Sequence, residues 1–369
     1  MHSTQERQAM PESTVAAPAG GRELPALGHQ EYWYPLLASH QVARRPVAVR
    51  ALGHELVLFR SEGQLSAFVD RCPHRGARLS QGRMLFPGTL SCGYHGWTFN
   101  RDGQCLASIV EGPESGIAGK ARVRTYPIQE RFGIVWVYFG LGQAPPLDED
   151  LPPELLEPNA LVQFYFEDWS ATWRNITENF VDSLHTIYVH RGSLMMLLDK
   201  VPAWGKLALD PLPDGKGINI YGTGGAMQAD YPGLGRFPRR SWWRIVTTPR
   251  LGRGYDVRMP GYIVLRRPTP FLKFRTSSVQ WPVPIDKDHT RVLTLYITYP
   301  RNALVKVAQQ LWYTVYFQWL LKGFVGQDKA LIENQRYRDP EKLSASDTGI
   351  IHWRRLAATI ERAPREADR

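Results

Sequence analysis

The chain has 369 residues, of which 43% are hydrophobic and 22% are charged, and its formal net charge is +10. These proportions are ordinary for a soluble globular protein, and the length suffices for one large or two moderate domains. The basic residues are spread along the chain, which argues against a nucleic-acid partner. The three cysteines are too few for a disulfide framework, which indicates a reduced, cytoplasmic protein.

The first part of the chain is predicted to be a small all-β unit. Residues 1–29 lack the apolar core of a signal peptide, and we expect a disordered lead-in. From about residue 32 to 140, short β-like runs alternate with turn signals such as Ser-Glu-Gly and Arg-Asp-Gly. A stretch rich in proline and acidic residues follows at 140–159. We therefore divide the chain into a lead-in (1–29), a β domain (30–145) and a second domain (146–369).

The second domain is predicted to have an α+β fold, in which helices cover a mainly antiparallel sheet. Residues 168–190 are predicted to form a helix, and the chain is expected to be helical again from about 302 to 337. Strand-like runs lie between these helical segments, at 261–267, 271–281 and 291–299. The most apolar stretch, 305–325, contains two lysines and three glutamines, so no transmembrane segment is expected.

Two of the three cysteines are each followed closely by a histidine, and seventeen residues separate the pairs. Cys72 and His74 are two apart, and Cys92 and His95 are three apart, so each pair can reach a single metal centre from one loop. Two such loops are suited to zinc, or to a two-iron cluster with cysteines on one iron and histidines on the other. The alternative is that the two histidines bind no metal and only pack against neighbouring side chains.

The pattern Cys-x-His followed by Cys-x-x-His resembles the Rieske family at all four positions. The resemblance implies a [2Fe-2S] cluster, with Cys72 and Cys92 on one iron and His74 and His95 on the other. Cys105 falls outside the pattern and is interpreted as a small buried residue.

A second group of polar residues lies in the predicted helix 168–190. His185 and His190 are five residues apart, about 140° around an ideal helix, so they can share a metal only if the helix ends or bulges between them. Two histidines and a carboxylate would form the triad of a non-haem Fe(II) oxygenase. Many downstream aspartates are candidates for the carboxylate. Asp328 is preferred because it follows the most apolar part of the C-terminal helical stretch, where an unpartnered carboxylate is unusual.

Together the two motifs resemble the Rieske non-haem iron oxygenases over about residues 30 to 340. In that family, a segment Asn-x-x-Asp-x-x-His-x4-His supplies two iron ligands, and it is matched here by Asn179, Asp182, His185 and His190. The third ligand comes from a segment like Glu-Asp-Lys, matched by Asp328 with Gln327 in place of the glutamate. The resemblance assigns catalytic roles to Asn179 and Asp182, and metal-ligand roles to His185, His190 and Asp328.

The resemblance also implies how the centres are connected. Family members form head-to-tail homotrimers, in which an aspartate at the position of Asp182 links a cluster histidine of one subunit to an iron histidine of the next. Electrons from NAD(P)H arrive through a ferredoxin or a flavin reductase. We expect this chain to be the terminal oxygenase of such a system, an oxidoreductase that incorporates O2. It would monooxygenate, by hydroxylation or oxidative demethylation, a hydrophobic aromatic or cyclic small molecule.

Other interpretations stay open from the sequence. A cis-dihydroxylating dioxygenase of the same family would carry the same motifs, and a non-catalytic Rieske electron-transfer protein would carry the cluster alone. Residues 193–201, rich in Met and Leu, would form a wall of the substrate pocket or ordinary core. The glycine-rich stretch 223–240 would be a gate. Four arginines beside the cluster loops would form a docking patch or would be solvated surface charges: Arg71, Arg75, Arg78 and Arg83.

Overall fold

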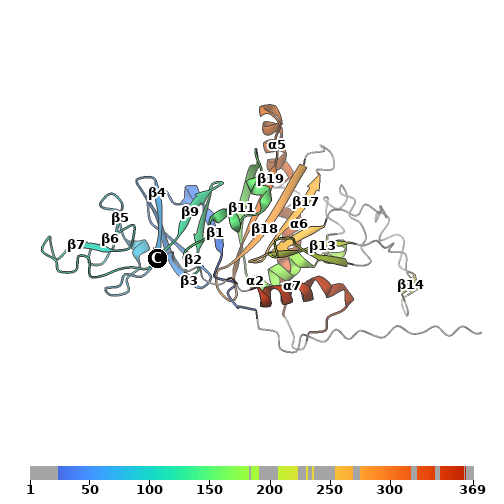
Figure 1. The fold of residues 1–369 in the computed structure, drawn as a ribbon, viewed down its shortest axis with the longest axis horizontal. Coiled ribbons are helices and arrows are strands. Elements are labelled where there is room, and N and C mark those ends of the chain that lie inside the picture. Colours follow the sequence, from blue (N-terminus) through green and yellow to red (C-terminus); the bar gives the residue numbers. More distant parts are fainter. Residues whose placement is uncertain are drawn as a thin grey trace, which may run out of the picture.

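The computed structural model places a small group of strands beside a large sheet that is flanked by helices (Figure 1). This arrangement confirms the predicted α+β fold, with a small β unit and a larger part built on an antiparallel sheet. The domain boundaries stay predictions. The structure describes residues 24–182, 184–190, 207–222, 230–231, 235–236, 254–268, 275–316, 322–336, 341–360 and 362.

The small β unit consists of three antiparallel sheets, in the strand orders β1-β10-β9, β2-β3-β4-β8 and β5-β6-β7. Each predicted strand-like run of this part lies in one of them, and β1, β7, β8 and β9 are additional. Cys105 opens β7 and is fully buried, as predicted. The strands are β1 (Trp33–Ala38), β2 (Val47–Ala51), β3 (His54–Ser61), β4 (Gln64–Val69), β5 (Thr89–Ser91), β6 (Trp97–Asn100), β7 (Cys105–Ser108), β8 (Thr125–Tyr126), β9 (Ile128–Arg131) and β10 (Ile134–Tyr138).

The large sheet is antiparallel throughout, in the order β11-β19-β18-β17-β16-β13-β12. A separate two-stranded hairpin pairs β14 (Asp230–Tyr231) with β15 (Gly235–Arg236). The strands of the sheet are β11 (Leu161–Trp169), β12 (Leu207–Pro211), β13 (Gly217–Gly222), β16 (Tyr255–Arg258), β17 (Tyr262–Pro268), β18 (Arg275–Pro284) and β19 (Thr290–Thr298).

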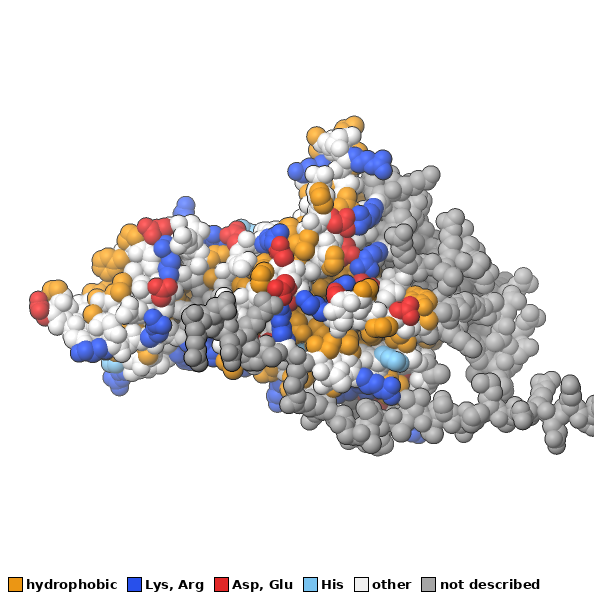
Figure 2. Space-filling model, in the orientation of Figure 1, with side chains coloured by type: hydrophobic (Ala, Val, Ile, Leu, Met, Phe, Trp, Pro, Cys, Tyr) orange, Lys and Arg blue, Asp and Glu red, His pale blue; other side chains and the backbone are white. Residues whose placement is uncertain are grey.

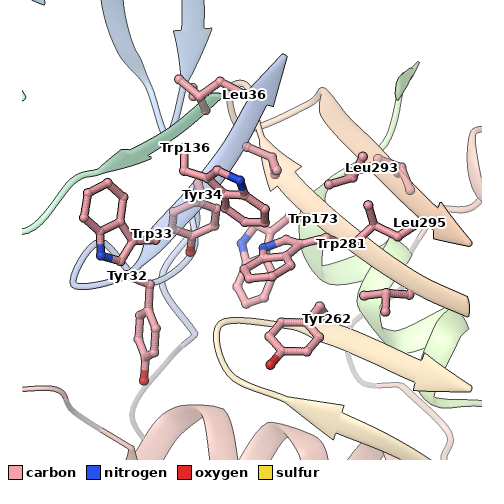
Figure 3. Close-up of a cluster of buried hydrophobic side chains, with 14 of the residues drawn as sticks. Tyr32, Trp33, Tyr34, Leu36, Trp136, Trp173, Tyr262, Trp281, Leu293 and Leu295 are labelled. Atoms are coloured by element: carbon pink, nitrogen blue, oxygen red, sulfur yellow. The ribbon is translucent and has the colours of Figure 1, made fainter. Parts of the chain in front are cut away.

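One face of the large sheet packs against the small β unit. Trp281 of β18 lies between Trp136 of β10 and Tyr262 of β17, with ring centroids 5.3 and 4.2 Å away. Figure 3 shows these rings beside Tyr34 of β1 and the leucines of β19. Burial of aromatic rings of this size contributes about 2–3 kcal/mol each, so this shared core fixes the two parts against each other.

The helices lie around the large sheet. Residues 168–190 do not form the single predicted helix: β11 occupies the start, Thr172 caps α2 by accepting the N–H of Asn175, and α2 ends before Asp182. After a short break the chain forms α3. The helices are α1 (Pro153–Leu156), α2 (Trp173–Val181), α3 (His185–Val189), α5 (Ala303–Tyr316), α6 (Lys322–Ile332) and α7 (Thr348–Thr359), with 3-10 turns at Ser39–Gln41, Leu79–Gln81, Leu147–Glu149 and Ala345–Asp347.

Among the described residues, none of the helices is long and apolar enough to cross a membrane. The apolar stretch 305–325 contains most of α5 and the start of α6. The C-terminal helix α7, which the sequence did not predict, packs on α2 through Arg354, whose guanidinium donates to the buried carboxylate of Glu178 at 2.7 Å.

Candidate functional site

Two loops of the small β unit have the same backbone pattern. In the first, the N–H of Cys72 donates to the carbonyl of Ala77 at 2.8 Å, and Gly76 donates back to the carbonyl of Cys72 at 2.9 Å. Cys92 forms the same two bonds with the residues five and four positions after it, at 2.8 and 3.1 Å. In each loop the residue four positions after the cysteine is a glycine with positive φ. The two Cys-His pairs therefore lie on matched loops, which we call the cluster loops.

The cysteines of the cluster loops face inward and the histidines face outward. Cys72 and Cys92 are 3% and 4% exposed, whereas His74 is exposed and His95 half-buried. The two imidazoles lie side by side, with centroids 4.7 Å apart, and Trp97 stacks on His74 at 4.5 Å. Thiolates on one side and imidazoles on the other are the donor arrangement of a Rieske [2Fe-2S] cluster, so these residues fit that group.

The protonation state of the Cys72 thiol supports a cationic partner. Burial, and then the neighbouring Cys92, raise the pKa of the Cys72 thiol to about 11, so without a metal this thiol stays neutral at pH 7. Bound iron would supply the positive charge that a buried thiolate needs. A group that the sequence did not reveal holds the first loop: buried Asp70 accepts both the N–H and the hydroxyl of Ser80, each at 2.6 Å.

The arginines around the cluster loops are partly neutralised. Arg71 and Arg78 both bind the carboxylate of Glu55, at 2.6 and 3.0 Å. Arg75 lies 6.0 Å from the centre of the Tyr94 ring. Since one carboxylate faces two guanidinium groups, the loops keep an excess of positive charge.

The second site lies where α3 meets α6. His185 begins α3, His190 follows its last residue, and Asp328 projects from α6. The carboxylate oxygen Oδ1 of Asp328 lies 3.3 Å from Nε2 of His185 and 3.0 Å from Nε2 of His190. The helix thus ends between the two histidines, as their spacing required, and the three donor atoms lie within 4.8 Å of one another.

The geometry of the three donors fits a metal better than it fits hydrogen bonds among them. Bonds of roughly 2.1 Å meeting at right angles separate ligand atoms by roughly 3 Å. Nε2 of His190 and Oδ1 of Asp328 have this separation, yet neither has a hydrogen-bond partner among the described residues. His190 is fully buried and Asp328 is 5% exposed. Buried polar atoms that converge without bonding one another are expected where a cation completes the site.

The charges of the triad favour a divalent cation. Burial opposes ionisation of Asp328, but the His185 and His190 imidazoles outweigh it and lower the pKa of the carboxyl, which stays ionised at pH 7. Burial would lower the pKa of His185, but Asp328 and then Asp182 outweigh it and raise that pKa. The same carboxylates that attract a proton to His185 would attract a metal ion in its place.

Gln327 supports the triad from outside it. Its Oε1 lies 2.9 Å from Nδ1 of His190 and accepts the imidazole N–H, which leaves Nε2 free to face Asp328. Phe324 stacks on the same imidazole, with centroids 3.5 Å apart. From the sequence, Gln327 was only a departure from the family motif. In the fold it orients a predicted ligand.

The other residues of the family segment have different surroundings. Oδ1 of Asp182 accepts the N–H of Leu184 at 3.0 Å, and Oδ2 lies 3.8 Å from Nδ1 of His185, beyond a direct hydrogen bond. Asn179 is half-buried, and its Nδ2 has no partner within the part of the chain that the structure describes. The neighbouring Glu178 is engaged with Arg174 and Arg354.

Several sequence predictions fall outside the described residues or on residues engaged elsewhere. The predicted pocket wall 193–201 and most of the predicted gate 223–240 lie outside the described residues. Of the aspartates considered beside Asp328, Asp214 pairs with Arg258 at 2.6 Å and Asp256 with Arg266 at 2.7 Å.

Comparison with known proteins matches both parts of the chain. The model of the Rieske [2Fe-2S] domain matches residues 32–127, and that of the homotrimeric ring hydroxylase matches residues 138–205. The terminal oxygenase component of carbazole 1,9a-dioxygenase from Sphingomonas sp. is 28% identical over 360 residues, covering 92% of this chain and 94% of that protein.

Two further comparisons differ in the chemistry that their names state. A methylxanthine N1-demethylase from Pseudomonas putida is 30% identical over 175 residues, covering 45% of this chain and 48% of that protein. A fluorene-bound oxygenase–ferredoxin complex of carbazole 1,9a-dioxygenase superposes with a TM-score of 0.78 at 25% identity, covering 91% of this chain and 92% of that chain.

Proposed function

Because the chain belongs to the Rieske non-haem iron oxygenases, as a terminal oxygenase component, we propose that it inserts one atom of O2 into a cyclic small molecule. The proposal rests above all on the convergence of His185, His190 and Asp328, whose donor atoms fit a metal with coordination positions left open. A protein that only carried electrons would not need this second set of donors.

The residues of the two sites have separate roles. We propose that Cys72, Cys92, His74 and His95 hold the [2Fe-2S] cluster, and that His185, His190 and Asp328 hold one Fe(II). Bound Fe(II) would supply the activation of O2 beside the substrate. The buried Asp328 carboxylate would give the donor set one negative charge, and Gln327 would hold His190 in the tautomer that a ligand requires.

We propose that electrons enter at the exposed imidazoles of the cluster loops. A ferredoxin or a flavin reductase, itself reduced by NAD(P)H, would be the donor, and a relative in complex with a ferredoxin supports the first choice. The positive charge left around the cluster loops would attract an acidic donor.

In a head-to-tail homotrimer, Asp182 would carry electrons from a cluster histidine of one subunit to His185 of the next. The family model for a homotrimeric hydroxylase supports this assembly. Within one chain, Oδ2 of Asp182 lies 3.8 Å from Nδ1 of His185, which is too far for a direct hydrogen bond. This oxygen can therefore still accept a hydrogen bond from a neighbouring subunit.

Monooxygenation and dihydroxylation differ in their products. Monooxygenation uses one O2, two electrons and two protons, puts one oxygen atom into a C–H bond and releases the other as water. When the oxygenated carbon is a methyl on N or O, the product loses formaldehyde and the methyl group is removed. Dihydroxylation uses the same O2, electrons and protons, but both oxygen atoms enter the substrate. It is the second candidate because the relative that covers 92% of this chain is a carbazole dioxygenase.

A single-turnover experiment tests the proposal. The protein, with its cluster reduced by dithionite, is mixed with ¹⁸O2 and a panel of aromatic, terpenoid and methylated-amine or -ether compounds, and the products are analysed by mass spectrometry. Gain of one ¹⁸O atom, or loss of a methyl group, is the expected result. Gain of two ¹⁸O atoms would move the assignment to dihydroxylation. Cluster oxidation without any change in the panel would favour the non-catalytic electron carrier.

A further inference from the structure

The face of the large sheet turned away from the small β unit is unusually polar. Paired residues of antiparallel strands point to the same face, so the register of β11, β19 and β18 defines rows across it. One row joins Tyr165, Thr294 and Gln280, and the next joins Gln163, Tyr296 and Ser278. A third row ends with Thr298 and Thr276. On the opposite face, the same strands place Phe164, Leu295 and Trp281 in the core.

The β19 side chains of this polar face are buried, and those of β11 are half-buried. Thr294 and Thr298 are each 1% exposed, and Tyr296 is 5% exposed and lies against Tyr313 of α5, with ring centroids 5.7 Å apart. Burial raises the pKa of the Tyr165 hydroxyl to about 12, so it stays protonated. Polar side chains are rarely enclosed without partners, because each unsatisfied group costs about 1–3 kcal/mol.

Helix α5 covers the polar face and buries one amide against it. Gln309 is 1% exposed and lies one turn before Tyr313, on the same side of the helix. On the same side of the helix, Val305, Trp312 and Tyr313 are half-buried. The exposed side of α5 also carries apolar residues: Leu304, Val307, Leu311 and Val315 are 53–81% exposed, and hydrophobic side chains are visible on this projecting helix in Figure 2. Gln309 is therefore enclosed beside aromatic side chains, where a buried amide needs hydrogen-bond partners.

Three side-chain oxygens in this space have no hydrogen-bond partner within the described parts of the chain. They are Oε1 of Gln163, Oγ1 of Thr298 and Oε1 of Gln309. Gln163 pairs with Tyr296 across the strands, and Tyr296 contacts Tyr313, one turn from Gln309. The two amides therefore border one buried region, which we call the polar wall: Gln163, Thr294, Thr298 and Gln309.

The polar wall adjoins the triad. On α6, Lys322 lies 5.7 Å from the centre of the Tyr165 ring, and Lys329 donates to Glu167 on the same sheet face at 2.9 Å. Asp328 is the residue before Lys329 on α6, so along β11 the metal donors lie nearest to Glu167. Gln163 is four residues away along β11, or about 13 Å at the usual rise per residue. That span matches a bicyclic or tricyclic molecule between the triad and the far end of the polar wall.

From this placement we propose that the polar wall is the substrate-recognition surface of the oxygenase site, and that it selects a neutral ring compound bearing amide-like N–H and C=O groups. The inference rests on the proposed function for the reaction itself. The two amides can each donate and accept, and the threonine hydroxyls do the same, whereas the polar wall contains no charged side chain. The aromatic rings of Tyr165 and Tyr296 would cover the ring faces. This class is more polar than the hydrophobic aromatic or cyclic molecule that the sequence predicted.

A binding experiment without turnover tests the inference. The purified protein, with its cluster oxidised and without a reductant, is titrated with 2-quinolone and with naphthalene, which has the same fused-ring shape without the lactam. Ligand-observed NMR gives both dissociation constants. We expect 2-quinolone to bind about tenfold more tightly, because a site built for hydrogen bonds discriminates against a ligand that leaves its polar groups unpaired. Gln309→Leu is expected to bring the two constants within a factor of two.

Gln310→Leu is the matched control, since Gln310 is the next residue on α5 and is exposed. It should leave the preference unchanged, and cluster absorbance with circular dichroism checks that both variants fold. Equal or tighter binding of naphthalene by the unchanged protein, or no binding of 2-quinolone, would overturn the inference. So would a lactam preference that survives Gln309→Leu. Because no electrons are supplied, a lactam preference without any oxygenated product would leave this inference standing and count only against the proposed function.

Discussion

Replacing Gln327 with leucine is expected to weaken metal binding at the triad without unfolding the protein. The amide oxygen of Gln327 is 2.9 Å from Nδ1 of His190, and this imidazole is fully buried. Leucine fills a similar volume but accepts no hydrogen bond. His190 would then lose the contact that fixes its N–H on Nδ1 and would populate the tautomer that places a proton on Nε2, the atom that faces Asp328.

The expected size of the effect follows from that contact. Loss of one acceptor for a buried N–H costs about 1–3 kcal/mol, and loss of a partner that orients a ligand lowers metal affinity by about 10- to 100-fold. Gln327→Glu restores an acceptor and adds a negative charge near the imidazole, so it should bind metal at least as tightly as the unchanged chain.

Competition between the protein and a chelator for Co(II) measures these affinities, with the visible absorption of Co(II) as the signal and the cluster spectrum as an internal reference. Gln335→Leu is the control, because Gln335 is exposed and lies beyond the end of α6. An affinity of Gln327→Leu within twofold of the control would refute the assigned role. So would a Gln327→Glu variant as weak as Gln327→Leu.

Three further predictions concern other parts of the account. Asp182→Asn should keep both metal sites but slow substrate-dependent reoxidation of the cluster by about tenfold or more, measured by stopped flow; a normal rate would contradict the bridge. Burial lowers the pKa of His29 from 6.5 to about 4, so the unfolded chain binds the proton first and stability falls as pH drops through that window. His29→Phe should therefore remove about 3 kcal/mol of this pH dependence in thermal unfolding, and an unchanged pH profile would refute it. Gly96 has a φ of +65°, and a Cβ there would lie 2.7 Å from Cβ of Ile109. Gly76 has a similar φ of +69°, but the space around it is open. Gly96→Ala should therefore lower the cluster content of the protein more than Gly76→Ala does. Equal iron content in the two alanine variants would contradict this reading.

The sequence predicted the fold best where local signals agreed. The cluster loops combine paired ligands with glycines, and the turns between their strands are marked by Gly and Pro, so both the unit and its predicted metal residues were visible. Strand β11 was missed because the proline- and acid-rich stretch ended at 159 and the predicted helix began at 168, so the alternating residues Val162, Phe164 and Phe166 were left unassigned.

The single helix predicted for residues 168–190 was wrong for a related reason. The spacing of its polar residues fitted one helical face, but Thr172 begins the helix and Asp182 ends it. Asp182 turns its carboxylate back to the N–H groups of Leu184 and His185, which competes with helix continuation. Long-range contacts were beyond the sequence altogether. The bond of Gln327 to His190 and the pairing of β11 with β19 arise only when segments more than a hundred residues apart come together.

The iron content of Asp328→Ala tests the central claim most directly. The unchanged chain should bind the two irons of the cluster and one more, and the variant should lose that one while the Rieske EPR signal of the reduced cluster stays the same. It should also lose all oxygenation. Three irons per chain in Asp328→Ala, or full turnover, would show that the metal centre does not lie between α3 and α6.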